Sequence, residues 1–325
     1  MQILSPRDYT SFQTLAKMNQ DELHRTVYRI LKKTYGKDNV KNDKDWVYAI
    51  GNIPIALVAH LDTVFASPPT EIFYDRVQNV IWSPQGLGAD DRAGVYSILQ
   101  IISKGYRPHV IFTTNEEWGG VGARALSYQE CPFKDLRYII ELDRAHYQDC
   151  VFYECDNDKF QVYIESFGFT TERGTYSDIC ELCPMWGIAG VNLSIGYRDE
   201  HSFSEVLFIA PMMRTINKVM QMLENPPAEQ FVFEWDCGQY MAACYRCGKK
   251  GVAFLMTPVE DAKGCKHWYC DDCVTNDNVE WCNECYEGFV PGVIVNGICP
   301  HCRDAKKRLR PYDIAYPVSG YQDEI

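Results

Sequence analysis

Cysteine is distributed unevenly along this chain of 325 residues, and its uneven distribution is what most constrains the fold. Ten of the fifteen cysteines lie between Cys237 and Cys302, and most of these stand in Cys-x-x-Cys pairs. Two such pairs make a tetrahedral zinc site, and without metal this stretch has too little apolar material to fold. We therefore expect a zinc-binding module at 237–311, after a large domain (1–224) and a proline-containing linker (225–236), and before a tail (312–325).

The composition of the chain limits the classes of function. It is 46% hydrophobic and carries a formal net charge of −12, which is ordinary for a globular protein. An acidic surface argues against binding the nucleic-acid backbone. The sequence shows neither a secretory signal nor an apolar stretch long enough to span a membrane. We therefore expect a cytoplasmic protein with no membrane contact and with reduced thiols.

Residues 1–224 alternate strand-like and helix-like segments. Strands are expected at 53–59, 74–82, 109–113, 138–142 and 188–195, and helices at 21–35, 92–102, 122–126 and 203–223. This alternation predicts an α/β three-layer sandwich with a mixed, largely parallel sheet, followed by the small cysteine-rich domain. In such sheets, ligand sites lie outside the carboxyl ends of the strands.

Side chains that can bind metal follow four of the strand-like segments, and one more precedes the helix at 92–102. In chain order they are His60, Asp62, Asp90, Glu116, Glu117, Asp143 and His201. Any one of them alone has an ordinary structural explanation, such as helix capping or a hydrogen-bonded core histidine. Gathered at one edge of a sheet, however, the carboxylates would repel one another strongly unless cations compensated. Imidazole and carboxylate ligands are what a hydrolytic site with two metal ions requires.

The motifs that contain these residues resemble, in their order, those of the double-zinc aminopeptidase family. That family belongs to the superfamily of co-catalytic zinc exopeptidases. The motifs are AHLDTV (59–64), GLGADDRAG (86–94), TNEEWGGVGA (114–123), ELD (141–143) and DEHSFSE (199–205). The resemblance implies a peptide substrate, two Zn²⁺ ions (with Co²⁺ or Mn²⁺ as alternatives) and a cis peptide bond after Asp90.

The same resemblance implies a role for each metal ligand. His60 and Asp143 would hold one ion. Glu117 and His201 would hold the other ion. Asp90 would bridge the two, so that five side chains from distant parts of the chain form one centre.

Four further residues are expected to act on the water, on a ligand or on the substrate. Glu116 would be the general base, and Asp62 would orient the imidazole of His60. Asp178 could accept the α-ammonium of a substrate, or it could equally cap the helix that follows it. Tyr197, four residues before the metal ligand His201, is a second candidate for substrate contact.

Two features favour an aminopeptidase within this superfamily. Aspartate at position 143 resembles the aminopeptidase and tripeptidase pattern, whereas deacylase and carboxypeptidase relatives often carry glutamate there. The interval from Asp143 to His201 is also too short for the domain that many carboxypeptidase-like relatives insert. The alternatives are a two-metal deacylase or carboxypeptidase that acts on N-acyl amino acids, and a non-catalytic binding protein that works through its zinc module.

The cysteine-rich region allows more than one pairing of its ligands. One arrangement resembles a RING cross-brace, with one ion held by Cys244, Cys247, Cys270 and Cys273. The second ion would then be held by Cys265 and His267 together with one of the later pairs. Alternatively, the later pairs form a zinc ribbon of their own from Cys282, Cys285, Cys299 and Cys302. Either arrangement predicts two or three structural zinc ions, in a module that could dock a protein partner.

Overall fold

The computed structural model describes residues 4–234, 241–252, 256–276 and 279–303. Cys237 and the expected tail at 312–325 lie outside the described residues. Contacts between Cα atoms divide the chain into two compact units, Met1–Trp235 and Asp236–Ile325. No helix in the described parts of either unit has the length and apolar character needed to cross a membrane.

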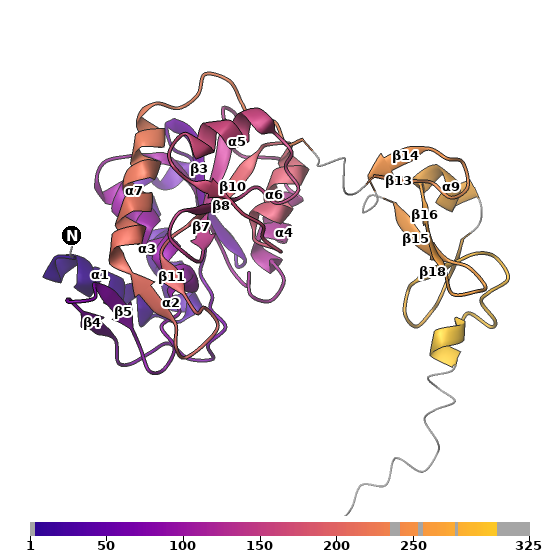
Figure 1. Cartoon of the computed structure of the whole chain (residues 1–325), viewed down its shortest axis with the longest axis horizontal. Coiled ribbons are helices and arrows are strands. Elements are labelled where there is room, and N and C mark those ends of the chain that lie inside the picture. Colours follow the sequence, from indigo (N-terminus) through magenta and orange to yellow (C-terminus); the bar gives the residue numbers. More distant parts are fainter. Residues whose placement is uncertain (1–3, 235–240, 253–255, 277–278, 304–325) are drawn as a thin grey trace, which may run out of the picture. The chain divides into compact units, whose positions relative to one another are not determined.

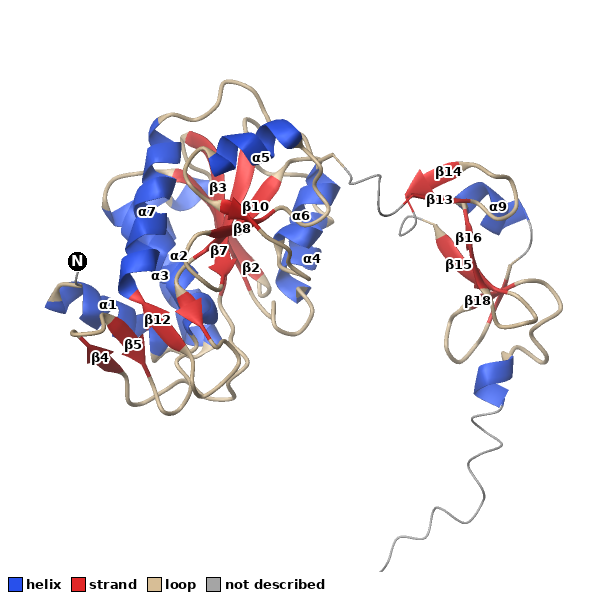
Figure 2. Cartoon of the chain, in the orientation of Figure 1, coloured by secondary structure: helices blue, strands red, loops and turns tan. Residues whose placement is uncertain are grey.

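The first unit is built on an eight-stranded sheet in the order β1-β2-β6-β3-β7-β10-β8-β9. Figure 2 shows the strands of this sheet in red between the helices of the unit. Its four central strands are mutually parallel: β6 (Pro108–Thr113), β3 (Ile53–His60), β7 (Tyr138–Arg144) and β10 (Gly190–Ser194). The flanking strands are β1 (Val40–Asn42), β2 (Trp46–Ala49), β8 (Asp149–Val151) and β9 (Thr170–Thr171). Because β1, β2 and β8 run antiparallel to an inner neighbour, the sheet is mixed, which confirms the predicted fold class.

The central strands are buried on both faces, and their side chains alternate between two apolar clusters. Ile55, Leu57 and Ala59 belong to one cluster, whereas Ala56 and Val58 belong to the other, as the two-residue period of a strand requires. The first cluster takes side chains from α1 (Pro6–Ala16), α2 (Gln20–Tyr35), α3 (Ala89–Ser103), α5 (Asp158–Glu165) and α7 (Ile209–Glu224). The second takes them from α4 (Val121–Ser127) and α6 (Ile179–Trp186), across the sheet from α3 and α7 (Figure 1). A short 3-10 helix, η1 (Lys37–Asn39), leads into β1.

One predicted strand is a hairpin. The segment 74–82 forms β4 (Phe73–Asp75) and β5 (Val80–Trp82), which pair antiparallel. The chain reverses between them at Asn79, whose φ of 59° lies in the left-handed region that asparagine tolerates. The sequence pattern therefore identified an extended segment here but missed the turn within it.

One predicted helix begins later than expected. The segment that starts at residue 203 is helical only from Ile209, because Val206–Phe208 form strand β12. This strand pairs with β5 and with β11 (Tyr197–Arg198), giving a small sheet in the order β11-β12-β5-β4. Residues 206–208, which follow the last motif, therefore belong to this small sheet and not to the helix.

Within its described residues (241–252, 256–276 and 279–303), the second unit shows two small sheets and little apolar core. Its elements are the hairpin of β13 (Met241–Ala243) and β14 (Lys250–Val252), the sheet of β16 (Lys266–Tyr269), β15 (Thr257–Glu260), β18 (Gly288–Phe289) and β17 (Glu280–Trp281), and α9 (Asp271–Asn276). Its buried clusters are small, and half or more of each consists of cysteine: Cys282, Phe289, Val293 and Cys299 in one, Cys244, Met256 and Cys270 in the other. Hydrophobic burial alone is therefore a weak source of stability for this unit.

Candidate active site

The parallel arrangement of the central strands brings the chemically important residues to one edge of the sheet. His60 is the last residue of β3, and Asp143 lies one residue before the end of β7. Glu116 and Glu117 stand in the turn that directly follows β6. Because parallel strands end at the same edge, residues far apart in the sequence become neighbours here.

Asp90, at the start of α3, lies between two groups of potential ligands. Its Oδ1 is 2.9 Å from Nε2 of His60, which in turn is 3.5 Å from Oδ1 of Asp143. Its Oδ2 is 3.2 Å from Nε2 of His201, which is 3.0 Å from Oε2 of Glu117. Within each group the ligand atoms lie within 4.8 Å of one another. Each group thus contains one imidazole, one carboxylate of its own and one oxygen of Asp90.

The donor chemistry of both groups fits a divalent metal better than it fits hydrogen bonding. Nε2 of His60 carries at most one proton but faces oxygens of both Asp90 and Asp143, and Nε2 of His201 likewise faces Asp90 and Glu117. One proton cannot form good hydrogen bonds to two acceptors at once, whereas one metal cation can be coordinated by the nitrogen and by both oxygens. Mixed imidazole and carboxylate sets of this kind suit zinc and similar ions.

The ionisation of the carboxylates indicates how crowded the site is. Burial and the charge of Asp90 raise the pKa of Glu117 to about 7, and the same two causes raise that of Asp143 well above its usual value. Burial also opposes the charge of Asp90, but hydrogen bonds with His201 and His60 outweigh it and lower the pKa of Asp90. Two cations placed at Asp90 would relieve this repulsion.

Asp62 supports the site from behind. Its Oδ1 lies 3.3 Å from Nδ1 of His60, on the side of the ring that faces away from Asp90. Its two oxygens also accept hydrogen bonds from the backbone N–H groups of Glu116 and Glu117, at 3.0 and 3.1 Å. One buried carboxylate therefore orients the imidazole and fixes the backbone of both glutamates.

Glu116 is only partly buried and lies next to the two groups. A ligand atom of Glu116 lies within 4.8 Å of ligand atoms of His60 and Glu117. Burial raises the pKa of Glu116, His60 counteracts this in part, and Asp90 raises it further. A carboxylate with a raised pKa beside a reacting centre suits a group that takes up a proton and releases it again.

Glu205 has a structural role that the sequence did not indicate, although it closes the motif that contains His201. It is 1% exposed, and its carboxylate accepts hydrogen bonds from the N–H groups of Gly88 (2.6 Å) and Asp90 (3.0 Å). Burial raises its pKa to about 7. Glu205 thereby ties the segment that carries His201 to the loop that carries Asp90.

Asp91 and Arg92 were likewise not assigned from the sequence. The peptide bond between Asp90 and Asp91 is cis, in agreement with the family resemblance. Asp91 accepts a hydrogen bond from the backbone N–H of His60 at 3.3 Å. The buried guanidinium of Arg92 donates to the carbonyl of Leu61 at 2.6 Å. These contacts join the start of α3 to the end of β3, so both sides of the site are held to each other.

Burial removes the two predicted substrate contacts, Asp178 and Tyr197, from the surface. Asp178 is fully buried and accepts a hydrogen bond from the hydroxyl of Thr113, while burial and the charge of Glu116 raise its pKa to about 7. Its side chain does not cap α6 either. Tyr197 is 2% exposed and donates to Oδ1 of Asp143 at 3.1 Å. Both residues therefore support the site from the interior.

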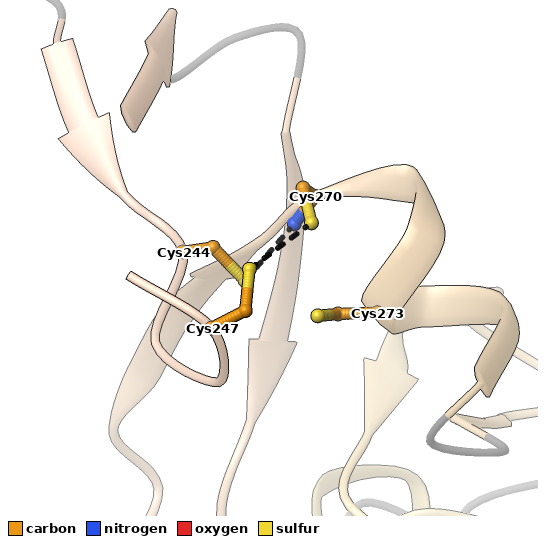
Figure 3. A group of neighbouring side chains, drawn as sticks. All are labelled: Cys244, Cys247, Cys270 and Cys273. Atoms are coloured by element: carbon orange, nitrogen blue, oxygen red, sulfur yellow. Dashed lines mark hydrogen bonds between the residues drawn. The ribbon is translucent and has the colours of Figure 1, made fainter. Parts of the chain in front are cut away.

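Four cysteines of the second unit converge from two segments (Figure 3). Cys244 and Cys247 lie on the turn between β13 and β14, facing Cys270 just before α9 and Cys273 within it. The N–H of Cys270 donates to Sγ of Cys244 at 3.4 Å, and Sγ of Cys270 lies 3.7 Å from that of Cys247. The four sulfur atoms are mutually within 4.8 Å, which is close enough for one ion.

Cys282, Cys285, Cys299 and Cys302 repeat this arrangement. The N–H of Cys299 donates to Sγ of Cys282 at 3.4 Å, and the sulfurs of Cys285 and Cys299 lie 3.7 Å apart. Backbone N–H groups, that of Cys285 foremost, lower the pKa of Cys282 to about 6. Cys282 is thus biased towards the thiolate that zinc requires.

Cys265 and His267 belong to neither group, contrary to the cross-brace arrangement. Cys265 is exposed at the turn before β16, and its N–H donates to Asp261. Nε2 of His267 lies 3.0 Å from Oδ2 of the same aspartate, and its ring stacks on Tyr245 at 3.9 Å. The hairpin of β15 and β16 holds both residues away from the cysteine groups, as in the second arrangement considered above.

Comparison with known proteins gives a fold but no sequence family. No protein-family model matches the chain, and no curated protein matches it either. Similar solved structures include a tripeptidase from Staphylococcus aureus (TM-score 0.54, 14% identity), aminopeptidase PepT from Bacillus cereus (0.52, 16%) and a TET aminopeptidase from a marine sediment archaeon (0.55, 12%). Each comparison covers 68% of this chain and 98% of the other. At such low identity the likeness shows the fold, and the chemistry has to be argued from the site.

Proposed function

We propose that this chain is a metal-dependent exopeptidase that releases N-terminal residues from peptides, with two metal ions sharing Asp90. The observation that carries the proposal is the division of the Asp90 carboxylate, with one oxygen in each of two ligand groups. The shared fold with structures named as a tripeptidase and aminopeptidases supports it. So does the agreement between the family motifs and the residues that converge.

His60 and Asp143 would hold one ion, Glu117 and His201 the other, and Asp90 both. Zinc fits this donor set best, with cobalt or manganese as alternatives. When bound, such ions lower the pKa of a water molecule and polarise a carbonyl group.

The chain's own residues would move the protons and keep the site in shape. Glu116 would take the proton of the attacking water on its carboxylate and deliver it to the nitrogen of the leaving amine. Burial, the largest cause, raises the pKa of Glu116, which favours uptake of a proton from water. Asp62 would hold Glu116 in position through the backbone, as its hydrogen bonds to both glutamates indicate.

The course of the chain between Asp143 and His201 favours an aminopeptidase. This interval contributes β8, β9 and β10 to the main sheet and α5 and α6 to the two buried clusters. It does not build a separate domain of the kind that carboxypeptidase-like relatives insert. An aminopeptidase is therefore preferred to a deacylase or carboxypeptidase acting on N-acyl amino acids.

For the second unit we propose two structural zinc ions, one in each group of four cysteines, within a docking module at 237–311 that follows a catalytic domain at 1–224. We also propose a cytoplasmic location, in which thiols stay reduced and can bind zinc. The ions would supply the folding energy that the small apolar clusters lack.

Exchanging Glu205 for Gln should weaken metal retention by about 10- to 100-fold, because the amide offers only one acceptor oxygen to the two N–H groups of Gly88 and Asp90. Metal bound after dialysis against a graded chelator buffer measures this. Glu200→Gln removes an exposed carboxylate from the same loop and is the matched control. Equal metal affinity in the two variants would show that Glu205 does not hold the Asp90 loop in its binding position.

Hydrolysis of paired substrates tests the proposed reaction. The zinc-loaded protein should cleave leucine p-nitroanilide and unblocked tripeptides but not their N-acetylated forms. Preferential release of amino acids from N-acyl substrates would instead indicate a deacylase. If the protein binds metal but hydrolyses neither class, it is a binding protein and the proposal is wrong.

A further inference from the structure

The carboxylate of Asp143 has more hydrogen-bonding partners than that of Glu117, although each would serve only one ion of the proposed centre. Among the described residues, His201 is the one hydrogen-bonding or ion-pair partner of the Glu117 carboxylate. The two oxygens of Asp143 instead lie against two different hydroxyl groups, in addition to facing His60. The two ligand groups therefore differ in how their carboxylates are held.

The hydroxyl of Tyr197 holds the oxygen of Asp143 that faces His60. Oδ1 of Asp143 lies 3.5 Å from Nε2 of His60, and it accepts a hydrogen bond from the Tyr197 hydroxyl at 3.1 Å. Tyr197, in β11, is 2% exposed, so bulk water does not compete for this contact. An ionised carboxylate oxygen has more than one lone pair, so Oδ1 can accept this hydrogen bond and still face a metal ion.

Ser177 lies at the other oxygen of Asp143 but is shared with a second carboxylate. Its Oγ is 3.2 Å from Oδ2 of Asp143 and 2.6 Å from Oε2 of the fully buried Glu141. The single proton of the Ser177 hydroxyl cannot form good hydrogen bonds to both carboxylates at once. Because the shorter of the two contacts is to Glu141, Tyr197 is the donor that Asp143 does not share.

Asn192, in β10, fixes the backbone of Asp143. Its Oδ1 accepts a hydrogen bond from the N–H of Asp143 at 3.0 Å, and its Nδ2 donates to the carbonyl of Asp143 at 2.9 Å. The freedom that remains to Asp143 is rotation about its side-chain bonds. The hydrogen bond from Tyr197 to Oδ1 restricts this rotation and so selects the oxygen that faces the other ligands.

A carboxylate that presents one fixed oxygen does not suit all divalent ions equally. Zinc in proteins usually has a small, tetrahedral set of ligand atoms, so it needs only one oxygen from each carboxylate. Manganese favours octahedral sites rich in oxygen, and large oxygen-bound ions often take both oxygens of a carboxylate. The contacts of Asp143 should therefore favour zinc over manganese at the position beside His60.

We propose that Tyr197 is a positioning residue that presents a single oxygen of Asp143 to one metal ion, and that it thereby sets the affinity of that position and its preference for zinc. This inference rests on the proposed function with two metal ions and adds a determinant of metal choice to it. Because Tyr197 acts through Asp143, its effect is confined to the ion beside His60.

The variant Tyr197→Phe tests the proposal, because it removes the hydroxyl and keeps the buried ring. Crystals of the full chain are equilibrated with graded free zinc, and anomalous maps give the occupancy of each peak at Asp90. The peak beside His60 and Asp143 should need about 10- to 100-fold more free zinc for half occupancy, whereas the peak beside Glu117 and His201 should keep its occupancy. With zinc and manganese offered together, the manganese share of the first peak should rise.

Tyr138→Phe is the matched control. It removes a buried hydroxyl from the opposite end of β7, where the partner is the hydroxyl of Tyr163 at 3.3 Å. This variant should leave both peaks and the preference for zinc unchanged.

Three results with Tyr197→Phe would overturn the proposal while the two-metal function stands. These are an unchanged first peak, an equal weakening of both peaks, and an unchanged ratio of zinc to manganese. The last two would indicate that the hydroxyl only stabilises the fold around the site. If the unmodified chain shows no metal at Asp90, the proposed function itself fails.

Discussion

Replacing Glu116 by Gln should lower kcat about 10²- to 10⁴-fold while both metal ions stay bound. The amide keeps the size of the side chain and leaves the backbone hydrogen bond to Asp62 in place. It cannot take a proton from water, however, so the step assigned to Glu116 is lost. Steady-state hydrolysis of leucine p-nitroanilide, together with the metal content of the same sample, measures both parts of the prediction.

The metal content matters because Glu116 also lies within 4.8 Å of His60 and Glu117. If the variant loses an ion, Glu116 is a ligand, and the loss of activity says nothing about proton transfer. If the variant keeps both its ions and its activity, another group is the base. Glu130→Gln, an exposed change in the same region of the chain, should behave as the unaltered protein does.

Replacing Cys270 by Ser should remove one zinc ion and unfold the part of the second unit that surrounds it. The group of Cys244, Cys247, Cys270 and Cys273 supplies most of the buried material there, with Met256 as the apolar residue. Zinc binding in small zinc domains contributes about 10–16 kcal/mol, more than the stability of most domains. Loss of one thiolate should therefore cost the local fold, seen as fast backbone hydrogen exchange in β13 and β16.

Cys265→Ser is the matched control, because it changes an exposed cysteine in the same unit that belongs to neither group. It should keep both zinc ions and the slow exchange of β16. The comparison also distinguishes the two pairings that the sequence allowed. If Cys265→Ser loses zinc as Cys270→Ser does, the cross-brace pairing holds in solution and the arrangement described here is wrong.

The sequence predicted the central strands and the residues at their ends because both follow from local patterns. A buried parallel strand is a continuous apolar run, and the residue that ends it is read directly, as with His60 after 53–59. The order of the motifs then indicated that His60, Asp143 and Glu117 belong to one site. Because the carboxyl ends of parallel strands lie at one edge of the sheet, no knowledge of long-range contacts is needed to expect these residues close together.

The supporting contacts could not be predicted because they join segments far apart in the sequence. Glu205 accepts hydrogen bonds from the N–H groups of Gly88 and Asp90, which are more than a hundred residues away in the sequence. These contacts form only because β12, which follows Glu205, packs beside the segment that carries Gly88 and Asp90. The hydrogen bond from Thr113 in β6 to the buried Asp178 likewise joins segments far apart in the sequence. A signal existed for Glu205, since it ends the DEHSFSE motif, but nothing in the motif states its partner.

The most direct test is an anomalous diffraction map of crystals of the zinc-loaded protein, collected on either side of the zinc absorption edge. Two peaks should appear at Asp90, one beside His60 and Asp143 and one beside Glu117 and His201, because each oxygen of Asp90 belongs to its own ligand group. A single peak, or none at Asp90 while the cysteine groups are filled, would contradict a two-metal centre.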